Sequence, residues 1–366
     1  MGFNCGIVGM PNVGKSTLFN ALTATAAAQA ANFPFCTIEP NVGRVALPDA
    51  RLDQIAKIAG SAQIVPTQLE FVDIAGLVKG ASQGEGLGNQ FLANIRETHA
   101  VIHVLRCFED DDIHHVDGSV DPIRDAEVIE TELLLADLES IDKQIENIAR
   151  KARGGDKDIV AQQEVMKRVK VLLDEGKPAR SVDLTHDEIP FFKTLGMLTG
   201  KPILYVCNVS EDDAATGNDL TAKVEAMAAQ QGAQSVTICA SIESEIAQLD
   251  SAEERAEFLE TIGLEEPGLN KIIRAGFNLL GLQTYFTAGP KEARAWTVRT
   301  GAKAPEAAGE IHTDFEKGFI KAEVIGFDDF IAAKGEQGAK DTGKMRMEGK
   351  EYVVKDGDVI LFKFNV

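Results

Sequence analysis

The chain has 366 residues, which favours two or three domains over one, and at 44% hydrophobic residues it can bury a substantial core. This composition excludes a disordered chain. The net charge of −20 excludes a generic nucleic-acid binder. Residues 283–366 carry 13 Lys and Arg against 14 Asp and Glu and are nearly neutral. The excess negative charge therefore lies before residue 283.

The first two predicted elements enclose a phosphate-binding pattern, residues 9–17, here called the phosphate loop. It fits G-x-x-x-x-G-K-[ST] and lies between an apolar strand-like run and a helical run. Its backbone N–H groups are expected to point at phosphate oxygens, while Lys15 reaches the β- and γ-phosphates and the Ser16 hydroxyl binds Mg²⁺. The nucleotide-binding residues predicted here are Asn12, Val13, Gly14, Lys15, Ser16 and Thr17.

Strand-like runs alternate with helical stretches, near residues 3–8, 69–73, 100–107, 202–207 and 235–239. This alternation predicts an α/β fold with a mostly parallel sheet covered on both faces. The phosphate loop then lies at the carboxyl end of the first strand, where such sheets bind ligands. His103, inside one of the strands, is expected to be a buried histidine whose hydrogen bonds are satisfied.

Two segments are expected to respond to the γ-phosphate. Thr37 follows the first helix, where a switch loop belongs, and its hydroxyl suits a second protein ligand for Mg²⁺. Asp73 ends a strand and can support Mg²⁺ through water, while the Gly76 N–H can reach the γ-phosphate. Leu77 stands where GTPases of the Ras type carry the glutamine that orients the attacking water, so hydrolysis requires another group.

The loop after the strand at 202–207 is expected to select the base. It reads Asn208-Val209-Ser210-Glu211, where guanine-specific proteins carry Asn-Lys-x-Asp. The longer Glu211 argues against strict GTP preference, although it also fits a relaxed guanine site. Ser241, after the next strand, is placed beside the base.

An acidic segment after the strand at 100–107 contains His114 and His115. A histidine there can position water, which Leu77 cannot do. The alternative is a solvated loop without a catalytic role.

Residues 125–200 are expected to form a helical hairpin inserted into the nucleotide domain. Apolar residues recur every three or four positions from Val128 to Ile148 and again from Val165 to Leu172. Residues 283–366 fit a small β-rich module, in which 352–362 are expected to form a hairpin around Asp-Gly. His312 and Asp314 are too few for a metal site and are interpreted as structural.

The five cysteines are Cys5, Cys36, Cys107, Cys207 and Cys239. Their wide spacing and odd number predict reduced thiols in a cytoplasmic protein rather than a disulfide framework or a zinc site. The sequence has no signal-peptide pattern and no run of 18 apolar residues, so no membrane partner is expected.

Taken together, these motifs resemble the YchF/Obg-like ATPase family, a branch of the P-loop GTPases. The motifs that carry the resemblance are the runs 11–17, 32–40, 73–81, 208–211, 284–289, 292–297 and 309–319. The resemblance covers essentially the whole chain. It implies a preference for ATP over GTP, with backbone groups at Val209 contacting adenine. It also implies that a histidine replaces the missing glutamine, and the family's histidine falls on His115.

The resemblance further implies three parts: a nucleotide domain (1–124 and 201–282), the coiled-coil hairpin (125–200) and a C-terminal TGS domain of β-grasp fold (283–366). The family is also similar to proteins that associate with ribosomes and act in translation or stress responses. The basic hairpin tip at 150–157 and the TGS domain are then candidate contacts for ribosomal RNA, and the alternative for the tip is a solvated hairpin end.

We therefore predict a monomeric, cytoplasmic, Mg²⁺-dependent ATPase that converts ATP to ADP as a conformational switch. Ser16, Thr37 and Asp73 serve Mg²⁺, and Gly76 and His115 serve catalysis. One alternative is a GTPase of the same fold, and another is a nucleotide-gated ribosome-binding module with incidental hydrolysis. The sequence leaves open whether K⁺ assists, as it can in related GTPases that carry an asparagine at the position of Asn12.

Overall fold

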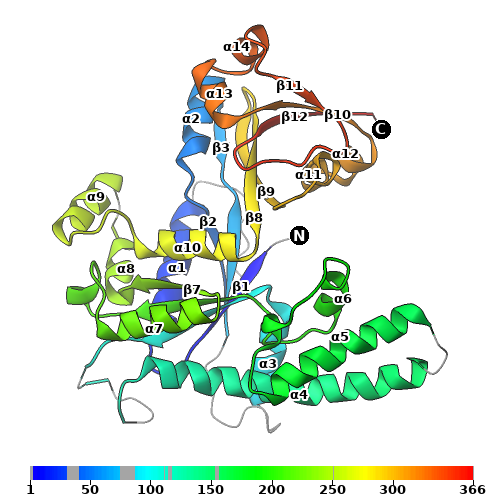
Figure 1. The fold of residues 1–366 in the computed structure, drawn as a ribbon. Helices are drawn as coiled ribbons and strands as arrows, with labels where there is room; N and C mark the ends of the chain where they lie inside the picture. Colours follow the sequence, from blue (N-terminus) through cyan, green and yellow to red (C-terminus); the bar gives the residue numbers. More distant parts are fainter. Residues whose placement is uncertain are drawn as a thin grey trace. The chain divides into compact units, whose positions relative to one another are not determined.

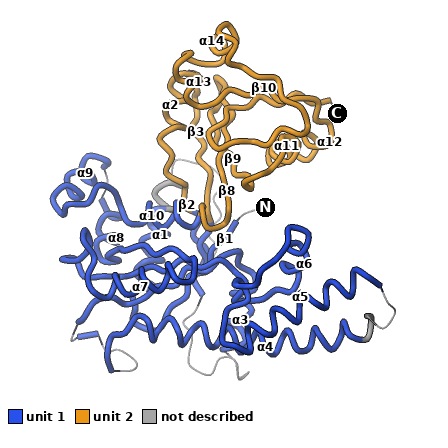
Figure 2. Tube along the Cα trace, viewed as in Figure 1, with its two compact units in different colours: residues 1–44, 70–276 blue, residues 45–69, 277–366 orange. Residues whose placement is uncertain are grey.

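The structure is a computed structural model that describes residues 3–30, 41–74, 87–110, 112–113, 118–152, 156–249 and 251–365. The chain divides into two compact units, which Figure 2 colours separately. The first unit contains residues 1–44 and 70–276, and the second contains residues 45–69 and 277–366.

The first unit is organised around a six-stranded sheet. Its strands lie in the order β2 (Val42–Ala46), β4 (Gln68–Asp73), β1 (Asn4–Val8), β5 (Ala100–Arg106), β6 (Ile203–Asn208) and β7 (Gln234–Ile238). Four neighbouring pairs, from β4–β1 to β6–β7, are parallel. Every residue of β5 and β6 is buried, as is typical of strands covered on both faces. The predicted, mostly parallel sheet is confirmed.

Most helices of the first unit connect these strands, and α8, α9 and α10 follow the last of them, β7. They are α1 (Lys15–Ala30), α3 (Leu87–Glu97), α4 (Pro122–Ala152), α5 (Lys157–Asp174), α6 (Ile189–Thr194), α7 (Asp219–Gln230), α8 (Ala240–Ile246), α9 (Ala252–Thr261) and α10 (Gly268–Leu279), with 3₁₀ turns η2 (Ala179–Ser181) and η3 (Glu211–Asp213). Helix α1 packs against α8, and α4 packs against β5 and α7 (Figure 1).

Helices α4 and α5 lie along each other as two long antiparallel helices (Figure 1). The Asp121 carboxylate accepts hydrogen bonds from the first turn of α4, and Pro122 occupies its first position, so the helix begins three residues before the predicted boundary. Leu134, Ile141 and Ile148 of α4 share a buried cluster with Met166, Val169 and Leu173 of α5. The residues of α4 follow the predicted stripe. On α5 Val169 does so, whereas Met166 and Leu173 each lie one residue after the predicted Val165 and Leu172. Each buried residue contributes roughly 1.5–3 kcal/mol.

The second unit contains a mixed six-stranded sheet. Its order is β11 (Arg346–Glu348), β10 (Phe319–Ile325), β12 (Val359–Phe364), β8 (Leu282–Ala288), β9 (Glu292–Arg299) and β3 (Gln63–Val65). The central strands β12 and β8 are parallel, and each has an antiparallel neighbour on its other side. Strand β3 is added in parallel to β9 at one edge.

Both faces of this sheet are covered. The helices of the second unit are α2 (Ala50–Ala59), α11 (Ala304–Ile311), α12 (Thr313–Lys317), α13 (Phe327–Ala332) and α14 (Glu336–Asp341). Successive residues of a strand point to opposite faces. Tyr285 accordingly joins a core formed with α11, whereas Phe286 joins a second core formed with α2 and α13.

Residues 45–69 belong to the second unit, although the sequence places them within the nucleotide domain at 1–124. The physical reason is pairing and burial. Strand β3 pairs with β9, and Leu52 and Ile55 of α2 enter the core that contains Phe286. The chain therefore leaves the first unit after β2 and returns to it in β4.

The expected hairpin at 352–362 is wrong. Only its second half is a strand, β12, which pairs with β10 on one side and β8 on the other. The first half contributes a single bridge, between Val353 and Lys303. Because β12 has a partner along both edges, the preceding residues cannot pair with it.

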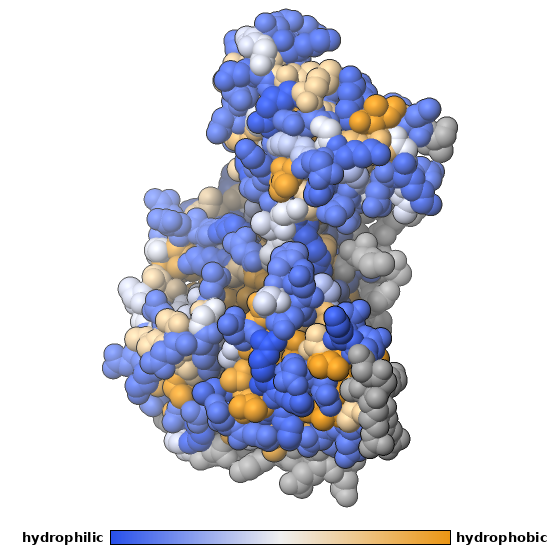
Figure 3. Space-filling view, turned by 45° about the vertical axis from the view of Figure 1, so that its right-hand side comes forward, coloured by the Kyte–Doolittle hydropathy of each residue, from blue (hydrophilic) through white to orange (hydrophobic). Residues whose placement is uncertain are grey.

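Figure 3 shows one face of the molecule, on which polar side chains predominate and apolar side chains form small patches. Large apolar side chains that are exposed in the second unit include Ile320 and Met347. Among the described residues, no helix combines the length and the apolar character needed to cross a membrane. Cys5, Cys107, Cys207 and Cys239 are free and buried, and Cys36 lies outside the described residues.

Candidate nucleotide site

The phosphate loop joins the end of β1 to the start of α1. Gly14 has φ of +91°, and a Cβ atom built on it would lie 2.2 Å from the Asn208 side-chain nitrogen. A Cβ atom on Gly9 would lie 2.8 Å from the Val104 carbonyl oxygen. Both glycines are therefore required by close approach, and Asn12 also has positive φ, +62°. The loop has the tight backbone path that phosphate binding requires.

Lys15 and Asp73 form an ion pair between the phosphate loop and the end of β4. Their side chains are 11% and 19% exposed, so both are largely shielded from water while still reachable. Strands β1 and β4 are in parallel register, with Ile7 opposite Asp73, which brings both carboxyl ends to one edge. The predicted phosphate-binding lysine and metal-supporting aspartate therefore lie together.

Asn208, at the end of β6, connects three segments of the site. Its side-chain nitrogen donates to the Val13 carbonyl oxygen at 3.0 Å, and its side-chain oxygen accepts from the Ala240 N–H at 2.9 Å. The residue is 5% exposed, so both bonds are shielded from water. Asn208 thus fixes the phosphate loop against the start of α8.

The other predicted base-selecting residues surround Asn208. Val209 is buried, and its N–H donates to the Ile238 carbonyl oxygen at 2.9 Å. The Ser241 hydroxyl donates to the Glu211 carboxylate at 3.3 Å, and both residues are exposed. Val209 and Glu211 therefore follow the carboxyl end of β6, and they meet the first turn of α8, which contains Ser241 and follows β7.

The oxygen ligands available near the phosphate loop fit Mg²⁺. This ion usually takes one or two protein ligands and completes its shell with phosphate oxygens and water. Ser16 and Thr17 are exposed in the first turn of α1, and the Asp73 carboxylate lies beside Lys15. In the described ranges, no three His, Cys, Asp or Glu side chains gather as a metal cluster. The donor set suits a metal that is bound together with a nucleotide.

Five residues of the predicted switch and catalytic segments lie outside the described residues. They are Thr37, Gly76, Leu77, His114 and His115. The basic hairpin tip is likewise outside the described part, apart from Asp156 and Lys157 and the backbone of 150–152.

Sequence reasoning missed Arg106, the last residue of β5. It is 2% exposed, and its guanidinium donates to the backbone carbonyl oxygens of Phe108, Asp110 and Ile113. The signal was a single charged residue at the end of an otherwise apolar run. A buried arginine of this kind requires acceptors nearby.

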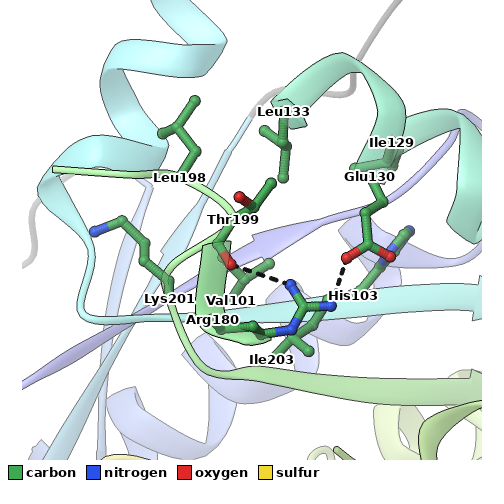
Figure 4. Close-up of a pocket in the computed structure, with 10 residues that line it drawn as sticks. All are labelled: Val101, His103, Ile129, Glu130, Leu133, Arg180, Leu198, Thr199, Lys201 and Ile203. Carbon is green, nitrogen blue, oxygen red and sulfur yellow. Dashed lines mark hydrogen bonds and ion pairs between the residues drawn. The ribbon is translucent and has the colours of Figure 1, made fainter. Parts of the chain in front are cut away.

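His103 is buried as predicted, but its hydrogen bonds are not all satisfied. Within the described part of the chain, its Nε2 atom has no hydrogen-bond partner. It lines a cavity of about 10 Å³, about the size of one water molecule, with Glu130 and Arg180 at the same cavity (Figure 4). Burial lowers the pKa of His103 to about 3, so the imidazole is neutral at pH 7.

His312 and Asp314 have a structural contact, in line with their interpretation. The His312 Nδ1 atom accepts a hydrogen bond from the Asp314 N–H at 3.1 Å and so caps α12. Trp296 is partly buried, stacks on Tyr285 and donates to the Thr287 hydroxyl at 2.9 Å. These residues therefore stabilise the second unit.

Two protein families match parts of this chain. Residues 4–161 match the family described as "50S ribosome-binding GTPase". Residues 282–365 match the YchF-GTPase_C family, which is described as a protein of unknown function. The two matches lie at opposite ends of the chain.

Full-length relatives are more informative. The chain is 59% identical over 366 residues to the ribosome-binding ATPase YchF of Escherichia coli O157:H7, with 100% of both chains covered. It is 54% identical over 368 residues to the protein of that name from Bacillus subtilis, again with 100% of both covered. The structure of the Schizosaccharomyces pombe YchF GTPase matches with a TM-score of 0.89 and 38% identity, covering 99% of this chain and 97% of that one. With identity this high along the entire length of its relatives, the chain belongs to the YchF family.

Proposed function

We propose that this protein is a Mg²⁺-dependent ATPase that binds ribosomes and switches between ATP-bound and ADP-bound states. The bacterial relatives are named ribosome-binding ATPases, and the full-length match extends over both units. The observation that carries the proposal is the convergence of Lys15, Asp73 and Asn208 at the carboxyl ends of β1, β4 and β6, three strands of one parallel sheet. Open α/β sheets bind nucleotides at this edge.

Lys15 is the phosphate-binding group. When a nucleotide is bound, its ammonium exchanges the Asp73 carboxylate for β- and γ-phosphate oxygens, and Asp73 becomes available to a metal. Backbone N–H groups donate hydrogen bonds to the remaining phosphate oxygens. They come from Asn12, Val13 and Gly14 and from the first turn of α1 at Ser16 and Thr17. These donors carry no side-chain charge, so they fit any nucleoside phosphate.

Mg²⁺ would be held by the hydroxyls of Ser16 and Thr37, with Asp73 supporting it through water. Bound there, the metal neutralises charge that develops on the phosphates. We assign Gly76 to recognition of the γ-phosphate and His115 to positioning of the attacking water, because Leu77 has no hydrogen-bonding group. K⁺ is an optional addition at Asn12, testable by comparing turnover in KCl and NaCl.

Adenine preference is supported by the loop at Val209. The side chain of Val209 is buried and its N–H is already engaged by Ile238, which leaves the carbonyl oxygen for a base. A carbonyl accepts a hydrogen bond from the adenine N6 amino group, whereas guanine presents the acceptor O6 at that position. Glu211, bonded to Ser241, replaces the aspartate that reads guanine.

The rival function is a GTPase of the same fold, and it is favoured by the name of the S. pombe relative. Calorimetric titration of nucleotide-free protein with ATP and with GTP, each with Mg²⁺, separates the two. We expect ATP to bind at least about tenfold more tightly, a difference of about 1.4 kcal/mol. Equal affinities would point to an unselective switch, and tighter GTP binding would refute the ATPase proposal.

A second rival is a nucleotide-gated ribosome-binding module in which hydrolysis is incidental. His115→Ala is the test, with single-turnover ATP hydrolysis and co-sedimentation with ribosomes as the two readouts. We expect slower hydrolysis with ATP affinity retained. Unchanged hydrolysis would refute the role of His115, and lost hydrolysis with normal ATP-dependent ribosome binding would favour the binding module.

We also propose a separate role for each domain. We assign nucleotide binding to 1–124 and 201–282 except for the excursion at 45–69, a helical contact arm to 125–200, and a TGS domain to 283–366. The basic tip at 150–157 and the TGS domain are the proposed contacts with ribosomal RNA. A ribosome-binding protein works where ribosomes are, so we place it in the cytoplasm, as a monomer that light scattering would verify.

A further inference from the structure

The second unit contains a cavity that the proposed ATPase activity does not use. Its volume is about 280 Å³, and every residue that lines it belongs to the second unit. The walls are the end of α2, the turn between β8 and β9, strands β10 and β12, and the segment that joins α13 to α14. A cavity of roughly 150 Å³ takes a benzene ring, so this cavity has room for a small organic molecule.

The inner wall of the cavity is apolar. Ile325, Phe330 and Val359 line it, and all three are buried in the core that contains Phe286. Leu361 lies two residues after Val359, on the same face of β12, and also lines the cavity. It is 43% exposed, so the cover over this face of the sheet ends between Val359 and Leu361. An apolar group that enters the cavity therefore removes apolar surface from water.

Three charged side chains line the cavity, and one of them is already paired. Glu323 forms an ion pair with Lys363, whose Nζ atom lies 3.5 Å from the Glu323 carboxylate. Lys334 and Glu336 are exposed, and within the described part of the chain neither side chain has an ion-pair or hydrogen-bond partner. The cavity therefore offers a ligand one ammonium and one carboxylate, which lie two residues apart in the chain.

The backbone that carries these two charges has a strained conformation. Lys334 has φ of +57°, in the left-handed region that glycine adopts more readily than lysine. It follows the end of α13, where glycine is the usual residue. The next residue, Gly335, is buried, and a Cβ atom built on it would lie 3.2 Å from Ile58 on α2. Since glycine would suit position 334 better, a lysine there indicates a function for its side chain.

We propose that this cavity binds a free α-amino acid with an apolar side chain. Lys334 pairs with the α-carboxylate, Glu336 pairs with the α-ammonium, and the apolar side chain enters the cavity beside Leu361. A zwitterion complements both charges, whereas an anion or a cation of the same shape leaves one of them unpaired. The assignment is independent of the nucleotide site, whose residues belong to the first unit.

Calorimetric titration of the full chain with small probes tests the chemistry of the ligand. Phenylalanine and leucine are the zwitterions, hydrocinnamate lacks the ammonium, phenethylamine lacks the carboxylate, and serine lacks an apolar side chain. We expect phenylalanine or leucine to bind at least about tenfold more tightly than each of the other three, a difference of about 1.4 kcal/mol. Equal binding of hydrocinnamate or phenethylamine, or no binding of either amino acid, would overturn the proposal.

Lys334→Gly separates a role in binding from a role in folding. Relief of the left-handed strain should raise the urea midpoint, followed by the fluorescence of Trp296 in the same unit, while loss of the ammonium should weaken phenylalanine binding at least about tenfold. Glu336→Gln should abolish the preference for phenylalanine over hydrocinnamate. Lys340→Met and Asp328→Asn are matched controls, because both side chains are exposed on α14 and α13 and neither lines the cavity.

A substitution that fills the cavity tests where the ligand lies. Ala59 lines the cavity at the end of α2, and Ala59→Leu should exclude phenylalanine while the two control variants bind it as the parent does. If Ala59→Leu or Lys334→Gly binds phenylalanine with parent affinity, the ligand lies elsewhere and the proposal is overturned. If Lys334→Gly loses stability together with binding, the lysine is merely structural, and the assignment of the carboxylate to Lys334 fails.

Discussion

Replacing Asn208 with alanine should damage both the stability of the first unit and its affinity for ATP. The side chain is buried and makes two bonds, to the Val13 carbonyl oxygen at 3.0 Å and from the Ala240 N–H at 2.9 Å. Truncation leaves both backbone groups without their partner. An unsatisfied buried polar group costs about 1–3 kcal/mol, so we expect a loss of about 3 kcal/mol in the free energy of unfolding.

ATP affinity should fall because one of these bonds orders the phosphate loop. Without it, binding must fix a loop that the parent protein holds in place, and we expect at least about tenfold weaker binding, or about 1.4 kcal/mol. Asn208→Asp tests the bond to the phosphate loop separately from the bond to α8. It keeps an acceptor for Ala240 but sets a carboxylate against the Val13 carbonyl oxygen, so it should weaken binding at least as much as alanine.

Urea unfolding and calorimetry measure the two effects. Trp296 is the single tryptophan and lies in the second unit, so its fluorescence should keep the parent midpoint while the circular dichroism of the helices shifts. Asn218→Ala is the matched control, because Asn218 caps α7 through its side chain and should reduce stability without reducing ATP affinity. A variant at Asn208 with parent stability and parent affinity would refute the reasoning.

Three other substitutions test separate features. Gly14→Ala should abolish measurable ATP binding in calorimetry, because the new Cβ atom would lie 2.2 Å from the Asn208 side-chain nitrogen. Gly60→Ala is the control, since Gly60 also has positive φ but no atom lies within 4 Å of a Cβ atom built on it. It should leave ATP affinity unchanged and lower the free energy of unfolding by about 1 kcal/mol. His103 has a folded-state pKa of about 3 against 6.5 for the free side chain, so the unfolded state binds the extra proton below pH 6.5 and the free energy of unfolding falls as the pH is lowered. At pH 5 this protonation lowers the free energy of unfolding by about 2 kcal/mol. His103→Leu should remove this contribution, so the urea midpoint of the variant should fall less between pH 7 and pH 5 than that of the parent. Asp137→Ala should cost about 3 kcal/mol in urea unfolding, because the buried carboxylate accepts three hydrogen bonds at 2.6–2.8 Å, while Asp142→Ala on the exposed face of α4 should cost less than about 1 kcal/mol.

The sequence was most informative where local pattern decides the structure. The glycines of the phosphate loop, the apolar strands and the stripe along α4 each depend on residues that are close in the chain. A continuous apolar run predicts a strand buried on both faces, and β5 and β6 are such strands. The positions of Lys15 and Asp73 followed because parallel strands place their carboxyl ends at one edge of a sheet.

Long-range pairing was not predictable in the same way. Nothing local in Gln63–Val65 indicates that it pairs with Glu292–Arg299, so the membership of residues 45–69 in the second unit could not be inferred. The hairpin expected at 352–362 failed for a similar reason, since Asp-Gly permits a tight turn but the neighbours of β12 were already determined by β8 and β10. A turn signal specifies a bend without specifying its partners.

Arg106 and Asn208 share a structural role that the sequence motifs did not reveal. They stand opposite each other in register as the last residues of β5 and β6, and the Cys107 N–H donates to the Asn208 carbonyl oxygen at 2.8 Å. Asn208 was predicted from its motif as a nucleotide-binding residue, yet its described bonds are to the backbone of the phosphate loop and α8. Arg106 belongs to no motif and likewise bonds the backbone of the loop that follows it.

Both side chains fix backbone at the edge of a rigid sheet. A catalytic loop must be held within a fraction of an ångström for proximity to accelerate a reaction, and loops supply few buried contacts of their own. Polar side chains at the ends of fully buried strands meet this need, because the strand fixes their Cα atoms and burial strengthens their hydrogen bonds. Loss of Asn208 should therefore weaken ATP binding, because it releases the phosphate loop from the bond to the Val13 carbonyl oxygen.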